Sequence, residues 1–453
     1  MALLDEISPL DGRYSSKVEE MSQFCSEGAL INKRILIEIK WLIYLIDKVK
    51  LKALRTDHKL AVKHLELILN NFDNIEAQHL KNIEQTICHD VKSVEYYIKN
   101  KLAGEQDLQH LIPFIHFACT SEDINNLSYA ILTKGIRDQI VEPHLEKLIN
   151  KLRGFAHDYA SHPMLSHTHG QIATPSTVGK EFANFVIRLK KAKEAINKVA
   201  IMAKFNGAVG NYNAHITAYP NLNWRKLNKQ FVESFGIEFS EYSTQIEAHD
   251  YLAELSHAMI RANNILIDLC RDIWIYMAFG YFHERLIEQE VGSSTMPHKV
   301  NPIQFENAEG NLGVANSLFD HFANKLPISR LQRDLSDSTV LRNLGVAFAH
   351  TLLAHKSIEK GLERLEINDK AISIDLSKHW EILAEAIQTV MRSEGIREAY
   401  EKLKSFSRGK EINRKLLQQF IEESELSDAA KQKLVKLTPC SYLGLAEELA
   451  KEC

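Results

Sequence analysis

The stretch VGKEFANFVIRLKKAKEAINKVAIMA, residues 178–203, carries the apolar seam that decides the fold. Its apolar residues recur in alternating steps of four and three, at Val178, Phe182, Phe185, Leu189, Ala192, Ile196, Val199 and Ala203. A mean step of about 3.5 residues keeps one apolar stripe facing a partner helix along a left-handed supercoil. The stretch therefore predicts a long packed helix. We expect it to begin near Thr174-Pro175, because proline is favoured at the first helical position.

Further stretches predict long helices of the same kind, at residues 252–276, 305–326, 341–365 and 124–160. Pro327 stops the helix at 305–326, and Pro143 predicts a kink in the helix at 124–160. The run Thr120-Ser121-Glu122-Asp123 ahead of that helix resembles a capping box. The middle of the chain is thus predicted to be a bundle of about five long helices.

Glycine and proline are scarce, at 19 and 10 of 453 residues, whereas average proteins contain about 7% and 5%. A chain with so few turn residues has long elements, which argues against sandwiches and barrels of many short strands. The length is about three times a common domain of ~150 residues. We predict an all-α fold with an N-terminal helical domain at 1–110, the central bundle at 111–365 and a C-terminal helical domain at 366–453.

Charge and cysteine usage exclude several classes of function. Lys and Arg number 55 and Asp and Glu number 59, so the net charge is −4 without a basic run. Such a chain is a poor candidate for binding nucleic acid or an anionic membrane. No apolar stretch approaches the ~20 residues of a membrane span. The acidic start and six scattered cysteines predict reduced thiols and a cytoplasmic location.

Two polar clusters lie beside the predicted bundle helices. Gly292-Ser-Ser-Thr-Met-Pro-His-Lys-Val-Asn-Pro302 is a hydroxyl-rich loop with a lysine, although a plain helix–helix connection is the alternative. Ser166-His167-Thr168-His169-Gly170-Gln171 holds two histidines that could bind a metal on a strand. The surroundings lack alternating strands, so a histidine that acts as a general acid or base is favoured over a metal ligand. The alternative is that these are loop histidines without a catalytic role.

Two further clusters are weaker. Cys88-His89-Asp90-Val91-Lys92 pairs a histidine with a carboxylate, and Arg330-Leu-Gln-Arg-Asp-Leu-Ser-Asp-Ser-Thr-Val-Leu-Arg342 supplies three arginines and three hydroxyls. Guanidinium groups at a helix start hold phosphate or carboxylate well, although a solvated helix cap is equally compatible with the pattern. No P-loop, G-x-G-x-x-G, H-E-x-x-H or G-x-S-x-G motif is present.

The loop GSSTMPHKVNP resembles the G-S-S-x-M-P-x-K-x-N loop of the fumarase/aspartase superfamily. Within that superfamily the chain is similar to the bacterial adenylosuccinate lyases over essentially its whole length. The stretches that carry this similarity are SPLDGRYSSKV, CHDVKSVEYYI, HFACTSEDINN, SHTHGQIATPSTVGKE, NGAVGNYNAH, TQIEAHDY and RDLSDSTVLRN.

The resemblance implies three helical domains and a homotetramer in which several subunits assemble each active site. It implies β-elimination of fumarate from two substrates, adenylosuccinate (giving AMP) and the succinylocarboxamide ribotide SAICAR (giving AICAR). It also implies that neither a metal nor an organic cofactor takes part, and that the partners are purine nucleotides rather than nucleic acid or membrane.

The resemblance assigns three catalytic positions, and the chemistry of the base adds a fourth. Ser293 matches the general base on a loop that closes over substrate, and His169 matches the general acid. His89 matches a second active-site histidine that positions substrate. A serine alkoxide is unfavourable in water and needs a nearby cation, for which Lys299 in the same loop is the natural choice.

The resemblance also assigns substrate-binding positions. Those that match the nucleotide-phosphate end are Arg13, Tyr14, Arg333, Ser338, Thr339 and Arg342. Those that match contacts to the rest of the substrate are His89, Asp90, Thr120, Ser121, Gln245, Ser294, Lys299, Val300, Asn301 and Asn307. Cys88 departs from the family pattern, in which asparagine is expected, so a side-chain contact of position 88 with substrate is in doubt.

Two rival functions are compatible with the fold. One is another fumarate-releasing lyase, acting on argininosuccinate, malate or aspartate. The Arg330–Arg342 segment argues against the small substrates, which have no phosphate to bind. The other is a catalytically silent helical scaffold, which we would expect to have lost Ser293, His169 or Lys299, all of which are present.

Overall fold

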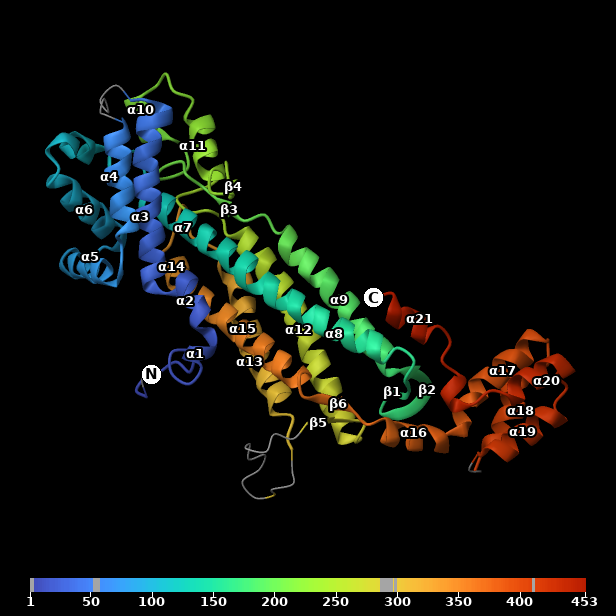
Figure 1. Ribbon diagram of the computed structural model, residues 1–453. Helices are drawn as coiled ribbons and strands as arrows, with labels where there is room; N and C mark the ends of the chain where they lie inside the picture. The colour runs from blue at the N-terminus through green and yellow to red at the C-terminus, as the bar shows by residue number, and fades with distance from the viewer. Residues whose placement is uncertain (1–3, 52–57, 286–295, 297–299, 410–411) are drawn as a thin grey trace. The chain divides into compact units, whose positions relative to one another are not determined.

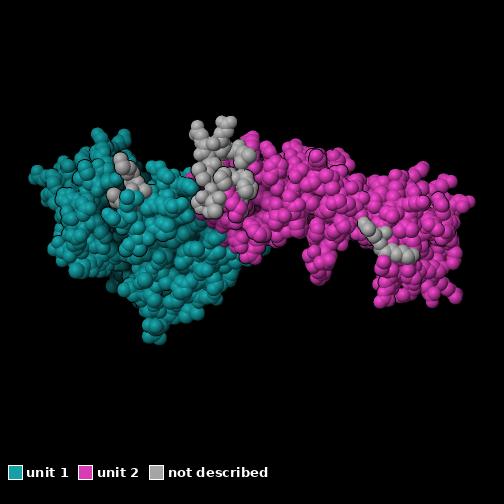
Figure 2. Space-filling view, turned by 90° about the horizontal axis from the view of Figure 1, so that it is seen from below, with its two compact units in different colours: residues 1–144, 192–264, 310–354 teal, residues 145–191, 265–309, 355–453 magenta. Residues whose placement is uncertain are grey.

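The computed structural model describes residues 4–51, 58–285, 296, 300–409 and 412–453, and most of them are helical (Figure 1). The chain divides into two compact units that interleave along the sequence (Figure 2). The first contains residues 1–144, 192–264 and 310–354, and the second contains residues 145–191, 265–309 and 355–453. The predicted all-α class is confirmed. The division into three domains stays a prediction.

The part of the chain before residue 115 consists of short and medium helices of the first unit. They are α1 (Ser15–Val18), η1 (Glu19–Met21), α2 (Ser22–Cys25), α3 (Glu27–Tyr44), η2 (Leu45–Val49), α4 (His58–Asn70), α5 (Asn74–Ile87), α6 (Asp90–Ala103) and η4 (Gln106–Phe114). Three more short helices of this unit are α10 (Asn213–Ala218), α11 (Trp224–Glu233) and α14 (Ser336–Leu341).

The long helices that the apolar seams predict are present. They are α7 (Ser121–Ile136), continued through the π-helical turn η5 (Arg137–Val141) into α8 (Glu142–Asp158), and α9 (Val178–Lys198), α12 (Asp250–Ala278), α13 (Ile303–Lys325) and α15 (Leu344–Leu362). In the first unit, Phe319 of α13 packs on Phe348 of α15 with ring centroids 5.0 Å apart. In the second unit, Phe155 of α8 stacks on Phe182 of α9 at 4.9 Å. Within each unit these helices therefore pack as a bundle.

The start of α7 and the bend before α8 follow the sequence. Asp123 accepts a hydrogen bond from the Thr120 amide at 2.8 Å, so the predicted capping box is confirmed. Pro143 has no N–H to donate to the carbonyl of Gln139, and the helix widens into the π turn immediately before it. The predicted irregularity at Pro143 is therefore a local π-helical turn.

Several predicted helix boundaries are wrong. The stretch 178–203 is helical only to Lys198, and its last residue, Ala203, belongs to strand β3 (Met202–Ala203). Thr174 and Pro175 belong to strand β2 (Gln171–Thr177), which pairs antiparallel with β1 (Pro163–Thr168), and α9 begins only at Val178. A residue before proline favours extended backbone, and pairing with β1 stabilises that conformation. The helix expected over 341–365 is shorter than predicted, because Leu341 ends α14, α15 spans only Leu344–Leu362, and Leu365 belongs to a strand.

The described strands form three two-stranded ladders. Besides the β1–β2 hairpin, β3 (Met202–Ala203) pairs parallel with β4 (Glu238–Phe239), and β5 (Phe282–Glu284) pairs antiparallel with β6 (Leu365–Ile367). These ladders tie loop segments to the helices that precede and follow them.

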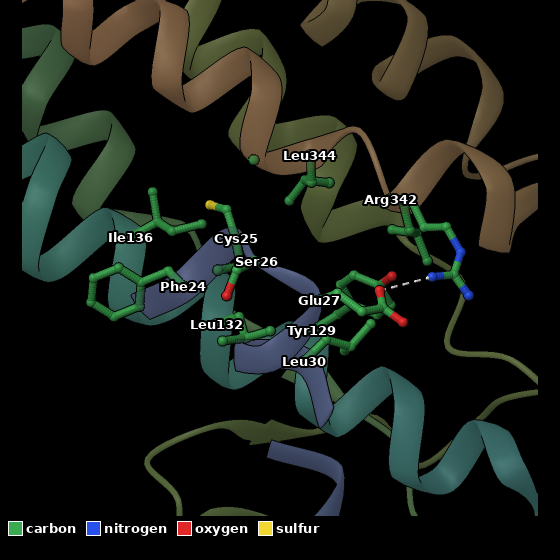
Figure 3. Close-up of a pocket in the computed structure, with 13 residues that line it drawn as sticks. Phe24, Cys25, Ser26, Glu27, Leu30, Tyr129, Leu132, Ile136, Arg342 and Leu344 are labelled. Carbon is green, nitrogen blue, oxygen red and sulfur yellow. Dashed lines mark hydrogen bonds and ion pairs between the residues drawn. The ribbon is translucent and has the colours of Figure 1, made fainter. Parts of the chain in front are cut away.

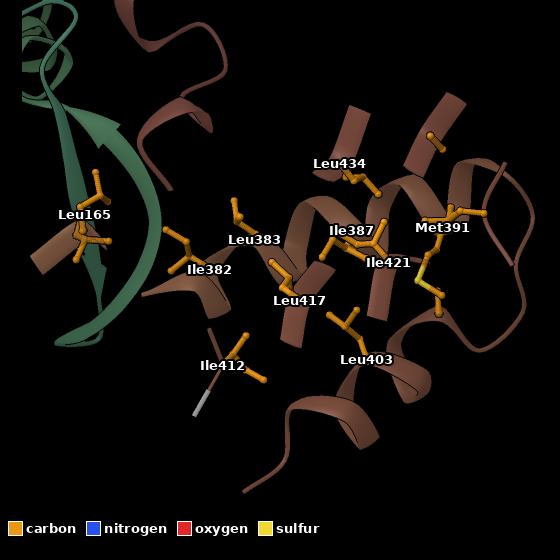
Figure 4. Packing of buried hydrophobic residues seen from close by; sticks show 14 residues of the cluster. Leu165, Ile382, Leu383, Ile387, Met391, Leu403, Ile412, Leu417, Ile421 and Leu434 are labelled. Atoms are coloured by element: carbon orange, nitrogen blue, oxygen red, sulfur yellow. The ribbon is translucent and has the colours of Figure 1, made fainter. Parts of the chain in front are cut away.

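The C-terminal part of the second unit has its own apolar core (Figure 4). Its helices are α16 (Asp369–Lys378), η6 (Trp380–Leu383), α17 (Ala384–Ser393), α18 (Ala399–Ser407), α19 (Arg414–Glu423), α20 (Asp428–Val435), η7 (Pro439–Ser441) and α21 (Ala446–Lys451). Ile387, Met391, Leu417 and Ile421 are fully buried there, and Leu165 of β1 joins the same cluster. The hairpin is therefore anchored in this core.

Candidate active site

A row of paired charges in the first unit contains several of the predicted substrate-binding residues. Arg34 is buried on α3, and its Nη2 lies 2.7 Å from Asp90 Oδ2. Arg342 Nη2 reaches the same oxygen at 3.5 Å. Burial raises the pKa of Asp90, but the Arg34 guanidinium, the Val91 amide and Arg342 outweigh it and leave the pKa below its usual value. Asp90 is therefore ionised and orients two arginines.

His89 is the residue that caps the start of α6. Its Nδ1 accepts a hydrogen bond from the Lys92 amide at 3.2 Å, so a neutral ring carries its proton on Nε2. The side chain is about half exposed, at 52%. This arrangement leaves an N–H donor for a ligand and suits a histidine that positions substrate.

Arg342 lies at one end of a cavity of about 220 Å³ in the first unit (Figure 3). It also lies 3.3 Å from Glu27, and the apolar wall includes Leu30 and Leu344. A second cavity of about 380 Å³ is lined by Asp11, Ser15 and Arg342. Asp11 and Ser15 flank the predicted residues Arg13 and Tyr14, whose side chains form a cation–π contact at 5.9 Å. The structure thus brings the N-terminal segment to Arg342.

Arg333 is the centre of a second charged group in the first unit. Its Nη2 lies 2.9 Å from Glu122 and 3.6 Å from Asp337. Burial raises the pKa of Glu122 above its usual value, although Arg333 opposes this. The backbone N–H of Gln245 donates to the backbone carbonyl of Gln332 at 3.3 Å, so Gln245 lies beside this group.

The side chain of Asn125 connects the two charged groups. It accepts from Arg34 Nε at 2.8 Å and donates to Glu122 at 2.8 Å. Thr120 and Ser121 start the same helix, α7, and both are partly exposed. The structure therefore gathers His89, Asp90, Arg333 and Arg342 around the first turns of α6 and α7.

Two predicted residues of this group act mainly through the backbone. Ser338 and Thr339 lie on α14, the short helix between Arg333 and Arg342. The Ser338 amide donates to Asp337 at 2.6 Å, and the Thr339 carbonyl accepts from Asn343 at 3.1 Å. Thr339 is exposed and its hydroxyl is available to a ligand.

His169 lies in the second unit, at the tip of the β1–β2 hairpin. Thr168 pairs with Gln171 across the tip, and His169 and Gly170 between them have φ of 54° and 72°. Positive φ at both central residues is typical of a type I′ turn. The expectation that this region lacks strands is wrong, because the turn residues themselves favour a hairpin. His169 is exposed at the tip, where a ligand can reach it.

An aromatic cluster holds the hairpin close to its tip, where His167 pairs with Ile172. The His167 ring lies 4.7 Å from Phe279 and 6.4 Å from Tyr281. Tyr281 in turn donates to Asp375 of α16 at 2.6 Å. Burial lowers the pKa of His167, so its ring is neutral and packs as an apolar group. His167 supports the hairpin, and His169 is the histidine presented to solvent.

Asn301 and Val300 line a cavity of about 560 Å³ in the second unit. Trp274, Phe282 and Glu306 line it too, and the Trp274 indole donates to Glu306 at 3.1 Å. Asn307, which follows Glu306 on α13, accepts a hydrogen bond from Ser357 of α15 at 2.9 Å and therefore helps to pack two helices. The predicted residues Ser293, Ser294 and Lys299 lie outside the described residues.

Two family models match the chain. A model described as lyase matches residues 12–316. A model described as adenylosuccinate lyase C-terminal matches residues 329–443, which include Arg333 and Arg342. A Legionella pneumophila (strain Corby) protein named adenylosuccinate lyase is 51% identical over 451 residues, covering 100% of this chain and 99% of that protein. This chain belongs to the adenylosuccinate lyase family.

Other members of the adenylosuccinate lyase family are similarly close. The Haemophilus influenzae and Escherichia coli (strain K12) proteins of that name are 48% and 47% identical over 452 residues, with 100% of this chain and 99% of theirs covered. Membership of the adenylosuccinate lyase family makes this chain a carbon–nitrogen lyase and an enzyme that takes purine nucleotide substrates.

Solved structures share the fold of this adenylosuccinate lyase family member. A fumarate lyase from Mesorhizobium sp. BNC1 superimposes with a TM-score of 0.77 at 16% identity, covering 96% of this chain and 97% of that one. A 3-carboxy-cis,cis-muconate lactonizing enzyme from Pseudomonas putida gives 0.75 at 20% identity, covering 96% of each chain. At these identities the likeness concerns the fold alone.

Cys88 departs from the asparagine that adenylosuccinate lyases are expected to have ahead of the His-Asp pair. Its backbone is left-handed, with φ of 54°, and it ends α5. Asparagine tolerates that conformation better than most residues, so backbone geometry is reason enough for asparagine there. The Cys88 thiol is exposed, and its nearest acceptor is the carbonyl of Gln85 at 3.9 Å.

Sequence reasoning missed several buried charges of this adenylosuccinate lyase family member, notably Arg34, Glu122, Asp337 and Lys204. A signal was present for two of them. Arg34 stands in the apolar run of α3, and Lys204 interrupts the apolar residues 199–205. A lone charge in an apolar run is a candidate for a buried, paired group.

In the part of the chain that the structure describes, no group of three or more His, Cys, Asp or Glu side chains is arranged to hold a metal ion. Among the helices that the structure describes, none is both long enough and apolar enough to cross a bilayer.

Proposed function

We propose that this protein releases fumarate from adenylosuccinate, giving AMP, and from SAICAR, giving AICAR. The observation that carries the proposal is the family match over the whole chain, including the adenylosuccinate lyase C-terminal model over residues 329–443. That segment holds Arg333 and Arg342, the cations suited to a nucleotide phosphate.

The chemistry requires positive charge and hydrogen-bond donors near one carboxylate. Removing a proton from the carbon beside a carboxylate builds further negative charge on that group, and donors aimed at it stabilise the transition state. We assign Ser293 as the base that removes the proton and Lys299 as the cation beside it. Both lie outside the described residues, so these roles rest on the resemblance.

His169 supplies the proton that the leaving nitrogen needs. The left-handed turn holds its ring at the exposed tip of the hairpin, and a histidine exchanges protons readily near neutral pH. His89, with its proton on Nε2, acts as a donor that positions substrate. Thr120, Ser121 and Gln245 contribute further polar contacts in the same unit as His89.

The test is an assay of purified protein with each substrate, in buffer that contains EDTA. We expect release of fumarate from both substrates at a rate that EDTA does not change. Absence of release would favour the silent-scaffold alternative. Loss of activity in EDTA that a divalent ion restores would show that the reaction depends on a metal.

We also propose a homotetramer with shared active sites. Large apolar side chains on the long helices, or directly after one of them, are exposed in the single chain, namely Ile187, Trp274, Ile275, Phe279, Ile303 and Val314. Trp274 and Phe279 are 45% and 46% exposed. We infer that other copies of the chain cover these side chains in the oligomer.

Mixing two inactive variants tests the sharing. His169→Ala and Ser293→Ala are each expected to be inactive, but tetramers that contain both are expected to regain activity. Activity returns only if one intact site is built from the unmutated residues of different chains. Light scattering that reports a fully active particle of 51.7 kDa would contradict the proposal.

Two other expectations stay predictions. The domains 1–110, 111–365 and 366–453 would be tested by limited proteolysis.

A cytoplasmic location is supported by the six free cysteines, because none is paired in a disulfide.

A further inference from the structure

Lys204 and Asp123 form an ion pair in the interior of the first unit. Lys204 Nζ lies 2.9 Å from Asp123 Oδ1, and the two side chains are 0% and 1% exposed. Asp123 lies in the first turn of α7, and Lys204 directly follows β3. Neither residue belongs to the proposed catalytic or substrate-binding groups. Two charges removed from water need complete hydrogen bonding, so the surroundings of the pair indicate its role.

Asp123 binds the backbone of two separate segments. One of its oxygens accepts a hydrogen bond from the backbone N–H of Thr120 at 2.8 Å. The other accepts from the backbone N–H of Asn206 at 3.0 Å. The Gly207 amide lies 3.2 Å from the carboxylate, and Lys204 Nζ donates to the Gly207 carbonyl at 2.8 Å. The pair therefore joins the Thr120–Ser121 turn to the loop that follows β3.

The same loop is joined to the segment that ends at Gln245. Ser243 donates to Asn206 at 3.0 Å. At Gly210, which has φ of 79°, a side chain would lie 2.4 Å from the Ser243 carbonyl oxygen, so only glycine allows this approach. The loop therefore connects Thr120 and Ser121 on one side with Gln245 on the other.

We propose that Lys204 is a positioning residue for substrate binding. Through Asp123 it fixes the position of the Thr120–Ser121 turn relative to Gln245. This inference rests on the proposed function, because it treats those three residues as substrate contacts. Lys204 itself is fully buried, so it acts through the residues that it holds. Its ammonium group neutralises the carboxylate that gathers the amides of both segments.

Lys204→Met tests the role, because methionine keeps the length of the side chain and removes the charge. Asp123 is then a buried carboxylate without its cation, and the amides it gathers are released. We expect kcat/KM for adenylosuccinate to fall about 10²-fold, the loss typical of a misplacement near 1 Å. Most of the fall is expected in KM. The double variant Lys204→Met/Asp123→Asn removes both charges. Its kcat/KM is expected to be about tenfold higher than that of Lys204→Met.

Two controls separate positioning from stability. Lys402→Met removes an exposed ion pair with Glu425, 2.7 Å long, and is expected to leave KM unchanged. Ile387→Ala makes a cavity in the C-terminal core and is expected to lower Tm without changing KM. If Lys204→Met behaves as Ile387→Ala does, the pair is only structural and the proposal is wrong. If Lys204→Met does not fold, Lys204→Gln takes its place with the same expected rise in KM.

Amide hydrogen exchange tests the inference independently of turnover. We expect the Thr120, Asn206 and Gly207 amides to exchange at least tenfold faster in Lys204→Met than in the unmodified protein. Unchanged exchange would overturn the proposal. If the unmodified protein releases no fumarate, the proposed function fails. The positioning role is then tested by the exchange rates of these amides together with the affinity for AMP. Lys204→Met is expected to weaken AMP binding, and Lys402→Met is expected to leave it unchanged.

Discussion

Ser293→Ala is expected to lower kcat by at least ~10²-fold, the usual loss when general acid–base help is removed. KM is expected to change far less. The serine acts on the proton in the transition state and contributes little to binding of the ground state, so its removal affects turnover first. Steady-state kinetics with adenylosuccinate measure both constants. Ser317→Ala is a matched control, because that hydroxyl is exposed and donates to the Gly313 carbonyl of its own helix.

A double variant of Lys299 and Ser293 tests whether the two residues act in the same step. If Lys299 stabilises the charge that develops near Ser293, then Lys299→Ala and Ser293→Ala disable one step. Their losses are therefore expected to be strongly non-additive. A double variant whose loss equals the product of the two single losses would show that the residues act independently, and the proposed roles would then be wrong.

His169→Asn is expected to lower kcat by ~10²- to 10⁴-fold while the fold stays intact. Position 169 has φ of 54° in a type I′ turn, where asparagine is among the favoured residues. The variant therefore keeps the hairpin and removes the proton donor. We expect unchanged Tm and nearly unchanged KM, measured by calorimetry and by fumarate release.

The controls for His169→Asn distinguish chemistry from turn geometry. His157→Asn changes an exposed histidine of α8 and is expected to be silent. Gly170→Ala places a side chain at φ of 72° and is expected to lower Tm through strain in the turn. Retention of more than a tenth of kcat in His169→Asn would assign the acid to another group.

The long helices could be predicted from sequence because their signal is local. Each apolar seam repeats every three or four residues, and the packing of that stripe on a partner decides the element. The boundary at Thr174-Pro175 was wrong for a physical reason. Proline suits a helix start, yet Pro175 pairs opposite Leu165, and the hairpin turn at His169-Gly170 brings the two strands together.

The composition of the candidate site could be predicted only in part. Motif resemblance pointed to His89, Asp90, Arg333 and Arg342, which the structure gathers in one unit. It did not point to Arg34, which lies 56 residues before Asp90 and reaches it at 2.7 Å. Contacts between residues so far apart leave no periodic trace in a single sequence.

The sequence by itself determined the helical class, the long bundle helices, the capped start of α7 and the family, since all of these depend on residue order over short stretches. Only the tertiary structure decided which charges are buried and what they bind. Lys204 and Asp123 are 81 positions apart in the sequence, yet their pairing gathers the amides of two loops. The reason is physical: a charge is stable in the interior only where the fold supplies every partner, and those partners come from distant segments.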